Sequence, residues 1–310
     1  MKTDREIFLI LRIFLLSVFC YFLIGCSSQP DTYSLAVEAY SKGEYSVAEP
    51  YFLTLLENGD TRTEVRVGHA YNLLQLGKYS NAIDEFLDLE AQLTDRDDLL
   101  AVKKAVLSAY LEKKNFAGAA RVYDELSRIV SDPEEAEGYV LEACRIRADL
   151  YEARGDKEQL AEELKKIIGI KQYAGEEAVR LYGLLSDNAD PLTKLRAADD
   201  YYMYISGHKL YVDDYLPAIM IMFDGANEAD YVEYEHDSEY YFKKAEEFMD
   251  LAAEQGMAEE ELLKFKIVIA ERRGKMELAY MLLGVYLNHC PDDELAVKEK
   301  KYLENRIGIK

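Results

Sequence analysis

The chain has 310 residues, of which 49% are hydrophobic, and its formal net charge at pH 7 is −22. Such an acidic chain cannot cover phosphates with a basic surface, so nucleic-acid binding is excluded on electrostatic grounds and attraction to anionic lipid heads is disfavoured. With only 6 prolines and 17 glycines there is little sequence for linkers, and this favours a folded, helix-rich body.

The first feature in chain order is a short apolar run that ends at a cysteine. The run spans residues 13–25 and follows a weakly positive start that carries Lys2, Arg5 and Arg12. Its 13 residues suit the apolar region of a signal peptide and are too few for a membrane-spanning helix. Leu23-Ile24-Gly25-Cys26 and the small polar residues after it resemble the lipobox of bacterial lipoproteins.

The resemblance to a lipobox implies that residues 1–25 are removed and that Cys26 receives a diacylglyceryl group. Two acyl chains anchor a protein stably, so we expect a lipid anchor on the extracytoplasmic face of a bacterial membrane. Residues 26–31 would form the linker, and Cys26 lies at most about 25 Å from Tyr33. Ser27, where an aspartate favours inner-membrane retention in such proteins, permits outer-membrane sorting in a cell with two membranes. The alternatives are an uncleaved signal anchor and an ordinary signal peptide with an incidental cysteine.

A period of 34 residues is visible in the next part of the chain. Residues 43–52 and 77–86 both read Gly-x-Tyr-x-x-Ala-x-x-x-Phe. Glycine suits the turn between two helices, alanine lets the second helix approach the first closely, and the aromatic residue fills the groove one turn later. The pattern and its period resemble those of tetratricopeptide repeats (TPRs).

The repeat pattern returns with drift along the chain. It is carried without the glycine by Tyr110, Asn115, Phe116, Ala119 and Tyr123, then by Ala148, Tyr151, Gly155, Leu160 and Leu164, and near the C-terminus by Gly274, Met276, Ala279 and Leu283. Turn spacings of 34, 37 and 41 predict lengthened helices or loops. The resemblance implies an all-α fold, a right-handed superhelical solenoid of antiparallel helix pairs over residues 32–310, with an atypical stretch at 172–257. A non-repeat helical bundle is the alternative.

The resemblance also implies a binding groove on the first helix of each pair, because stacked pairs curve and such helices line the concave side. The family alignment places nine residues there: Tyr33, Val37, Tyr40, Val67, Tyr71, Leu74, Lys104, Ser108 and Leu111. This groove would suit an extended, partly aromatic or basic segment better than an acidic tail. The alternative is that several of these side chains pack between helices.

Residues 207–242 break the rhythm of the repeats. Asp213-Asp214 as capping residues and Pro217 early in the first turn are typical of a helix start. The run 218–223, Ala-Ile-Met-Ile-Met-Phe, predicts a buried helix, with a methionine-rich partner-binding face as the alternative. Carboxylates around His236 in segment 230–241 could hold a divalent cation, but they lack the order of a calcium loop, so a solvated loop leading into a helix is favoured.

The sequence contains no phosphate-binding loop, dinucleotide fingerprint, zinc-protease motif or Cys-x-x-Cys pair. The four histidines are scattered at positions 69, 208, 236 and 289. We therefore predict no catalytic residues, no cofactor and no bound metal. Cys144 and Cys290 lie far apart in an architecture where each repeat touches only its neighbours, so we predict two buried free thiols rather than a disulfide.

Together these features favour a membrane-anchored scaffold for protein–protein interaction in the bacterial envelope, with an envelope or exported protein as the partner and a role in envelope assembly or secretion. The alternative function is a solute-binding lipoprotein of a transport system, with tyrosines lining a ligand pocket. Such proteins need two α/β lobes, and this sequence has almost no strand-like runs.

Replacing the lipidated cysteine tests the membrane anchor directly. Cys26→Ala removes the sulfur that accepts diacylglyceryl, so the protein should leave the membrane fraction or persist as an unprocessed precursor, as read by fractionation and mass. If Cys26→Ala stays with the membranes at mature size, the lipoprotein interpretation is wrong.

Overall fold

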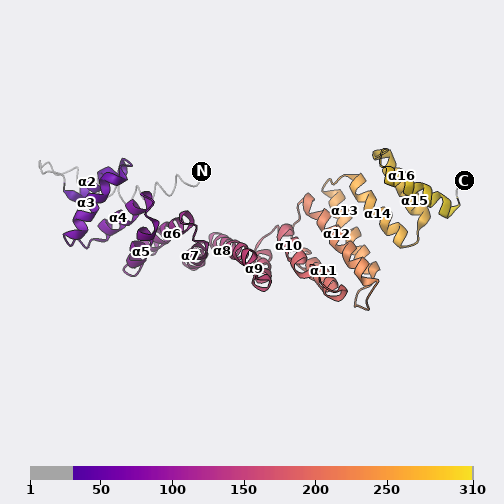
Figure 1. The fold of residues 1–310 in the computed structure, drawn as a ribbon, viewed down its shortest axis with the longest axis horizontal. Coiled ribbons are helices and arrows are strands. Elements are labelled where there is room, and N and C mark those ends of the chain that lie inside the picture. The colour runs from indigo at the N-terminus through magenta and orange to yellow at the C-terminus, as the bar shows by residue number, and fades with distance from the viewer. Residues whose placement is uncertain (1–30, 309–310) are drawn as a thin grey trace. The chain divides into compact units, whose positions relative to one another are not determined.

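The computed structural model describes residues 31–308; the predicted signal peptide, Cys26 and linker residues 26–30 lie outside the described residues. Fifteen helices and no strand occur between residues 31 and 308 (Figure 1). They fall into two compact units, which we call unit 1 (residues 31–115) and unit 2 (residues 116–308). Within the part of the chain that the structure describes, no helix has the length and apolar character needed to cross a membrane.

Unit 1 is a row of five helices in which each contacts the next. The helices are α2 (Thr32–Ser41), α3 (Tyr45–Glu57), α4 (Thr63–Gln75), α5 (Tyr79–Glu90) and α6 (Arg96–Glu112). Helix α2 also contacts α4, so the first helices of the first two pairs are neighbours. The predicted all-α arrangement of antiparallel helix pairs is confirmed.

The turns of unit 1 explain the sequence pattern that repeats every 34 residues. Gly43 and Gly77 have φ of 76° and 72°, a left-handed conformation that costs glycine nothing because it has no Cβ. The backbone N–H after each glycine donates to a carbonyl five residues back, at 3.0 Å and 2.9 Å respectively, which closes the first helix. Lys114 holds the third such turn with φ of 56°.

The residues after these turns form the contact between paired helices. Ala48, Ala82, Phe52 and Phe86 are all fully buried. Gly68 on α4 allows a similar close approach between consecutive pairs, because a Cβ there would lie 2.8 Å from Cε1 of Phe52 on α3. The sequence analysis did not single out Gly68, which follows no turn and belongs to no repeated motif.

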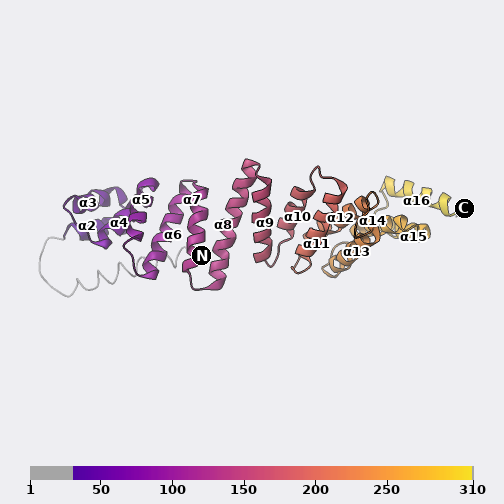
Figure 2. The ribbon, with the colours of Figure 1, turned by 90° about the horizontal axis from the view of Figure 1, so that it is seen from below.

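Unit 2 continues the same pairing over ten helices, each in contact with the next (Figures 1 and 2). They are α7 (Phe116–Ile129), α8 (Pro133–Arg154), α9 (Lys157–Ile170), α10 (Gly175–Ser186), α11 (Pro191–Ile205), α12 (Val212–Ala229), α13 (Ser238–Glu254), α14 (Glu259–Arg272), α15 (Met276–His289) and α16 (Glu294–Ile307). The growing turn spacing comes from longer helices, since α4, α6 and α8 have 13, 17 and 22 residues.

The atypical middle of the chain is helical as well. Helix α12 begins at Val212, so Pro217 lies in its second turn. The predicted position of Pro217 in the first turn is therefore wrong. The predicted buried helix is confirmed, although Met220 is 52% exposed. Gly225 allows α13 to approach, because a Cβ there would lie 2.7 Å from Cδ1 of Tyr241. Segment 230–237 is a loop that leads into α13, whose first turn is capped by Asp237.

The left-handed lysine at the third turn gives a stability test. Lys114→Gly should stabilise the full chain by about 0.5–1 kcal/mol, because a non-glycine residue at positive φ costs roughly 1–2 kcal/mol and the added chain entropy of glycine offsets part of that gain. Urea unfolding measures the change. The matched control is Lys113→Gly, which removes the same charge at a residue with φ of −73° and should destabilise. A shift of both variants in the same direction would contradict this account.

Candidate functional site

The nine residues predicted to line a groove all lie in unit 1, on α2, α4 and α6. Tyr33, Val37, Tyr40, Val67, Tyr71, Leu74 and Lys104 are half-buried, whereas Ser108 and Leu111 are exposed. Helices α2 and α4 contact each other, which brings their six residues onto neighbouring helices. The Tyr71 hydroxyl donates to the carbonyl of Ala101, 3.4 Å away on α6. This bond connects the groove residues of α4 to α6, the helix that carries Lys104, Ser108 and Leu111.

Three tyrosines form the aromatic part of this surface, and each has a defined neighbour. The guanidinium of Arg62 lies 5.0 Å from the centre of the Tyr33 ring, within the range of a cation–π interaction. Tyr40 meets Tyr45 edge-on at 5.3 Å between ring centres, and Tyr71 meets Phe86 in the same way at 5.0 Å. The rings therefore pack partly on their own unit and keep part of their area at the surface.

Burial also disfavours the ionised form of two of these tyrosines, Tyr33 and Tyr40. Burial raises the pKa of Tyr33 above its ordinary value. It raises the pKa of Tyr40 further, with smaller contributions from Tyr45 and Tyr71. A tyrosine phenol is already neutral near pH 7, so these shifts only keep Tyr33 and Tyr40 in the form that can donate hydrogen bonds to higher pH.

Buried polar pairs beneath this surface hold the helices of unit 1 together. His69 on α4 has Nδ1 2.6 Å from Oε2 of Glu85 on α5, and Lys103 on α6 has Nζ 2.8 Å from Oε2 of Glu90. The Asn72 amide donates to the carbonyl of Tyr45 at 3.1 Å. A buried polar group needs such partners to avoid a desolvation cost. The sequence offered only a weak signal for them, namely polar residues on the apolar faces of helices.

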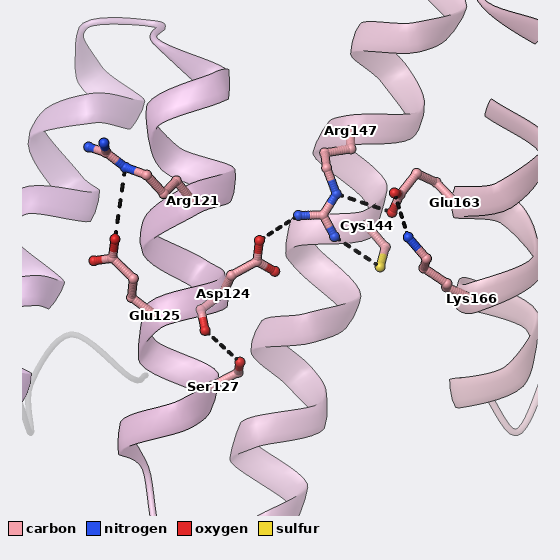
Figure 3. A network of polar contacts seen from close by, with 8 residues as sticks. All are labelled: Arg121, Asp124, Glu125, Ser127, Cys144, Arg147, Glu163 and Lys166. Carbon is pink, nitrogen blue, oxygen red and sulfur yellow. Dashed lines mark hydrogen bonds and ion pairs between the residues drawn. The ribbon is translucent and has the colours of Figure 1, made fainter. Parts of the chain in front are cut away.

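In unit 2, Arg147 on α8 has polar partners on both neighbouring helices, α7 and α9 (Figure 3). Its guanidinium donates to Oδ2 of Asp124 at 2.7 Å and to Sγ of Cys144 at 3.5 Å. Its Nε lies 3.1 Å from Oε2 of Glu163, and Lys166 donates to the other oxygen of Glu163 at 2.9 Å. One side chain thus ties three consecutive helices together.

The chemistry of this cluster is structural rather than nucleophilic. Burial raises the pKa of the Cys144 thiol, and its interaction with Glu163 raises it further, so the thiol stays protonated at neutral pH. Burial also opposes the charged form of Glu163, but bonds from Lys166 and Cys144 and the charge of Arg147 outweigh it and lower the pKa of Glu163. An ionised carboxylate and a neutral thiol follow from this arrangement.

The predicted free thiols are confirmed for both cysteines. Cys144 is fully buried as predicted, but the prediction of burial is wrong for Cys290, which is only half-buried at the end of α15. Between residues 31 and 308 no group of three or more histidine, cysteine, aspartate or glutamate side chains is arranged to hold a metal ion. His236 instead stacks on Tyr240, with 3.7 Å between ring centres.

Two open hollows mark the surface of unit 2. One, of about 390 Å³, lies between α13, α14 and α15 and is lined partly by Met249, Ile269, Lys266 and Leu282. The other, of about 440 Å³, lies between α9 and α10. Neither hollow is lined by any of the nine predicted groove residues.

Comparison with known proteins finds no protein-family model and no curated protein that matches this chain.

Solved structures do show similarity in their helices. A tetratricopeptide repeat protein from Parabacteroides merdae is 13% identical with a TM-score of 0.32, and the alignment covers 86% of this chain and 95% of that protein's chain. A TPR repeats protein from Bacteroides fragilis is 13% identical with a TM-score of 0.41, and the alignment covers 72% of this chain and 100% of that one. A chain of the APC/C hetero-tetramer Cut9-Hcn1 is 12% identical with a TM-score of 0.32, and the alignment covers 88% of this chain and 55% of that one. Because each of these three TM-scores is below 0.5, the fold assignment rests on the helix pairs and turns described above.

The Arg147 cluster predicts a measurable loss of stability. Breaking a buried ion pair costs about 3–5 kcal/mol, but the Arg147 side chain is 23% exposed and Lys166 remains beside Glu163, so we expect Arg147→Ala to cost about 2 kcal/mol in urea unfolding. The matched control is Arg145→Ala on the same helix, whose exposed pair with Glu142 should contribute less than about 0.5 kcal/mol.

The cost of Arg147→Ala should depend on pH in a defined direction. Because the pKa of Glu163 is lowered on folding, its stabilising effect is present above the unfolded value of 4.5 and is lost as the pH falls below it. The difference in the free energy of unfolding between wild type and Arg147→Ala should therefore become smaller below about pH 4.5. Equal losses of unfolding free energy for Arg147→Ala and Arg145→Ala would contradict the structural role assigned to Arg147. So would a difference between wild type and Arg147→Ala that grows as the pH falls.

Proposed function

We propose that this chain is a lipid-anchored scaffold that binds an extended segment of an envelope or exported protein on the extracytoplasmic face of a bacterial membrane. The observation that carries the proposal is the partly exposed aromatic and aliphatic surface on α2, α4 and α6. Stacked helix pairs present such a surface to peptides and protein segments in many repeat proteins.

The proposed membrane position is supported by the spacing between the lipobox and the first helix. Helix α2 begins at Thr32, six residues after Cys26. An anchor at Cys26 would therefore keep unit 1 within a few tens of ångströms of the lipid surface. The acidic chain offers little attraction to anionic lipid heads, so in this proposal the acyl chains alone provide membrane attachment.

The chemistry of the surface favours a basic or aromatic partner segment. Without residues 1–25, which hold three basic and two acidic residues, the chain has a net charge of −23. Arg62 over the Tyr33 ring is an internal example of the cation–π contact that a partner lysine or arginine would make with the neighbouring tyrosines. Charge attraction would speed the approach of such a segment.

The alternative functions have less support. A solute-binding lipoprotein would need two α/β lobes, and residues 31–308 contain no strand. An enzymatic role would need an activated nucleophile or base, and the Cys144 thiol is kept protonated by burial. A protein-binding scaffold remains the function that the helix pairs support best.

A charge placed on the proposed surface tests the proposal. Leu111 is 36% exposed at the outer end of the nine residues, so Leu111→Asp should disturb binding without unfolding unit 1. Tagged full-length protein is purified in mild detergent from the bacterium that encodes it, and co-purifying envelope proteins are quantified. We expect recovery of the partner to fall at least tenfold with Leu111→Asp, because a buried unpaired charge is costly at an interface.

The matched control for this experiment is Leu87→Asp on α5, since Leu87 is 38% exposed and lies on the second helix of its pair. It should recover the partner as well as wild type does. Recovery of no envelope protein above background, or recovery with Leu111→Asp that equals that of wild type, would count against the scaffold. Equal loss with both variants would instead indicate damage to the fold, which circular dichroism detects.

A further inference from the structure

Helix α15 is apolar over more of its circumference than its core contacts require. It packs on α14 and α16, and the side chains that it buries in the shared hydrophobic cluster are Ala279, Leu283 and Tyr286. Beside them, Leu278, Met281 and Val285 are 39%, 60% and 40% exposed. A surface helix of a globular protein usually turns polar side chains to solvent. Helix α15 therefore carries a second apolar stripe that its neighbours leave open.

The exposed residues form one line along the helix. Leu278, Met281, Leu282 and Val285 are three or four positions apart, so they lie on the same face, and we call these four residues the α15 stripe. The hollow of about 390 Å³ borders this stripe, since Leu278 and Leu282 are among its lining residues. A ridge of side chains beside a hollow is a shape with which the side chains of another molecule can interdigitate.

Exposed apolar side chains are concentrated in the same part of the chain. Of the 17 large hydrophobic side chains that are exposed between residues 31 and 308, seven lie on α14, α15 and α16, although residues 259–308 are only 50 of these 278 residues. Three of the seven are on α16, which packs on α15, and they are Leu295, Val297 and Tyr302. Gathered apolar side chains mark an interaction site more often than scattered ones do.

This part of the chain also has no net charge. Residues 259–310 hold ten acidic and ten basic residues, so the whole net charge of −22 belongs to residues 1–258. Contact between two copies through the acidic part of the chain is opposed by repulsion between like charges. Contact through residues 259–310 adds no such net repulsion. The charge pattern therefore favours this segment as the place where two copies of the chain can meet.

We propose that the α15 stripe is the centre of a symmetric interface between two copies of this chain. Homodimer interfaces are more apolar than those of transient complexes, and their cores are depleted in charged residues. A twofold interface uses the same surface on both copies, and an antiparallel pair of α15 helices meets this condition. Leu278 of one copy then lies opposite Val285 of the second copy, with Met281 and Leu282 beside the twofold axis.

Other occupants suit the stripe less well. A membrane surface is bound by helices that flank an apolar face with lysine and arginine, and α15 contains neither residue type. A basic protein segment would find no net negative charge on residues 259–310 to attract it. A second copy needs neither kind of attraction, because burial of apolar surface drives its contact.

The size of a stable interface indicates that α16 takes part as well. A typical interface buries about 800 Å² on each partner, which is more than four side chains of one helix can supply. Leu295, Val297 and Tyr302 on α16 are the nearest further source of exposed apolar area. All of these residues belong to unit 2, so the inference does not depend on the lipid anchor or on the partner proposed for unit 1.

Cysteine cross-linking of the full chain tests the antiparallel arrangement. With the axis between residues 281 and 282, two copies of residue 281 are offset by about 1.5 Å along the helices, and two copies of residue 288 by about 20 Å. Met281→Cys should therefore give a disulfide-linked dimer on mild oxidation, in a Cys290→Ser background that removes the half-buried thiol.

The matched control for cross-linking is Asn288→Cys, which is also exposed on α15 and should stay monomeric on a denaturing gel. The Cys290→Ser parent gives the background. Equal yields from Met281→Cys and Asn288→Cys would indicate random collision and overturn the proposal. So would the absence of a cross-linked dimer with Met281→Cys, which is the result expected if a lipid surface or another protein covers the stripe.

A charge on the stripe tests the dimer by its mass. In mild detergent, the full-length wild-type protein should show twice the protein mass of a monomer by light scattering. Met281→Lys should halve that mass, because it buries unpaired charges beside the axis. The matched control Met220→Lys, at a residue that is 52% exposed on α12, should remain a dimer. A monomeric wild type, or a dimer that persists with Met281→Lys, would overturn the proposal.

Discussion

The close approach of the two helices in each pair is the constraint on which the rest of the structure depends. It requires a residue without a large side chain just after the turn, and Ala48, Ala82 and Ala279 are fully buried at that place. Once the helices are that close, an aromatic or aliphatic side chain one turn later fills the remaining groove, as the fully buried Phe52 and Phe86 do. Phe52 also lies against Gly68 on α4, the first helix of the next pair. The exposed faces of α2, α4 and α6 are set by this packing, and so is the surface that we propose as a binding site.

The features that sequence could predict are those that depend on local spacing. The turn glycines and the alanine five residues later identified the helix pairs, because each acts on its immediate neighbours. The Lys114 turn shows that the conformation persists without glycine when the surrounding helices determine it. Pro217 was placed one turn too early because the N-cap of the helix is Tyr211, a residue type that gives no capping signal in sequence. Asp214 does act at this helix start, but from inside the first turn, where its carboxylate accepts from the Tyr211 backbone N–H at 2.8 Å. Exposure of individual groove residues could not be predicted, since it depends on the neighbouring helix pair.

Polar partners were the least predictable part of the candidate sites. Arg147 bridges Asp124 and Glu163, which are 23 and 16 positions away on different helices. His69 and Glu85 likewise meet only because α4 packs on α5. Sequence shows that such residues are polar on a half-buried face, but the identity of the partner follows from the relative rotation of two helices.

The buried thiol in the Arg147 cluster has a consequence for the reactivity of the folded protein. Thiol exchange proceeds through the thiolate, and Cys144 is both inaccessible and held in its protonated form once α8 and α9 have packed. Cys144 should therefore resist thiol reagents for as long as α8 and α9 stay packed, whereas Cys290, which is only half-buried, lacks that protection. A difference in labelling rate between the two cysteines would thus report on the packing of these two helices.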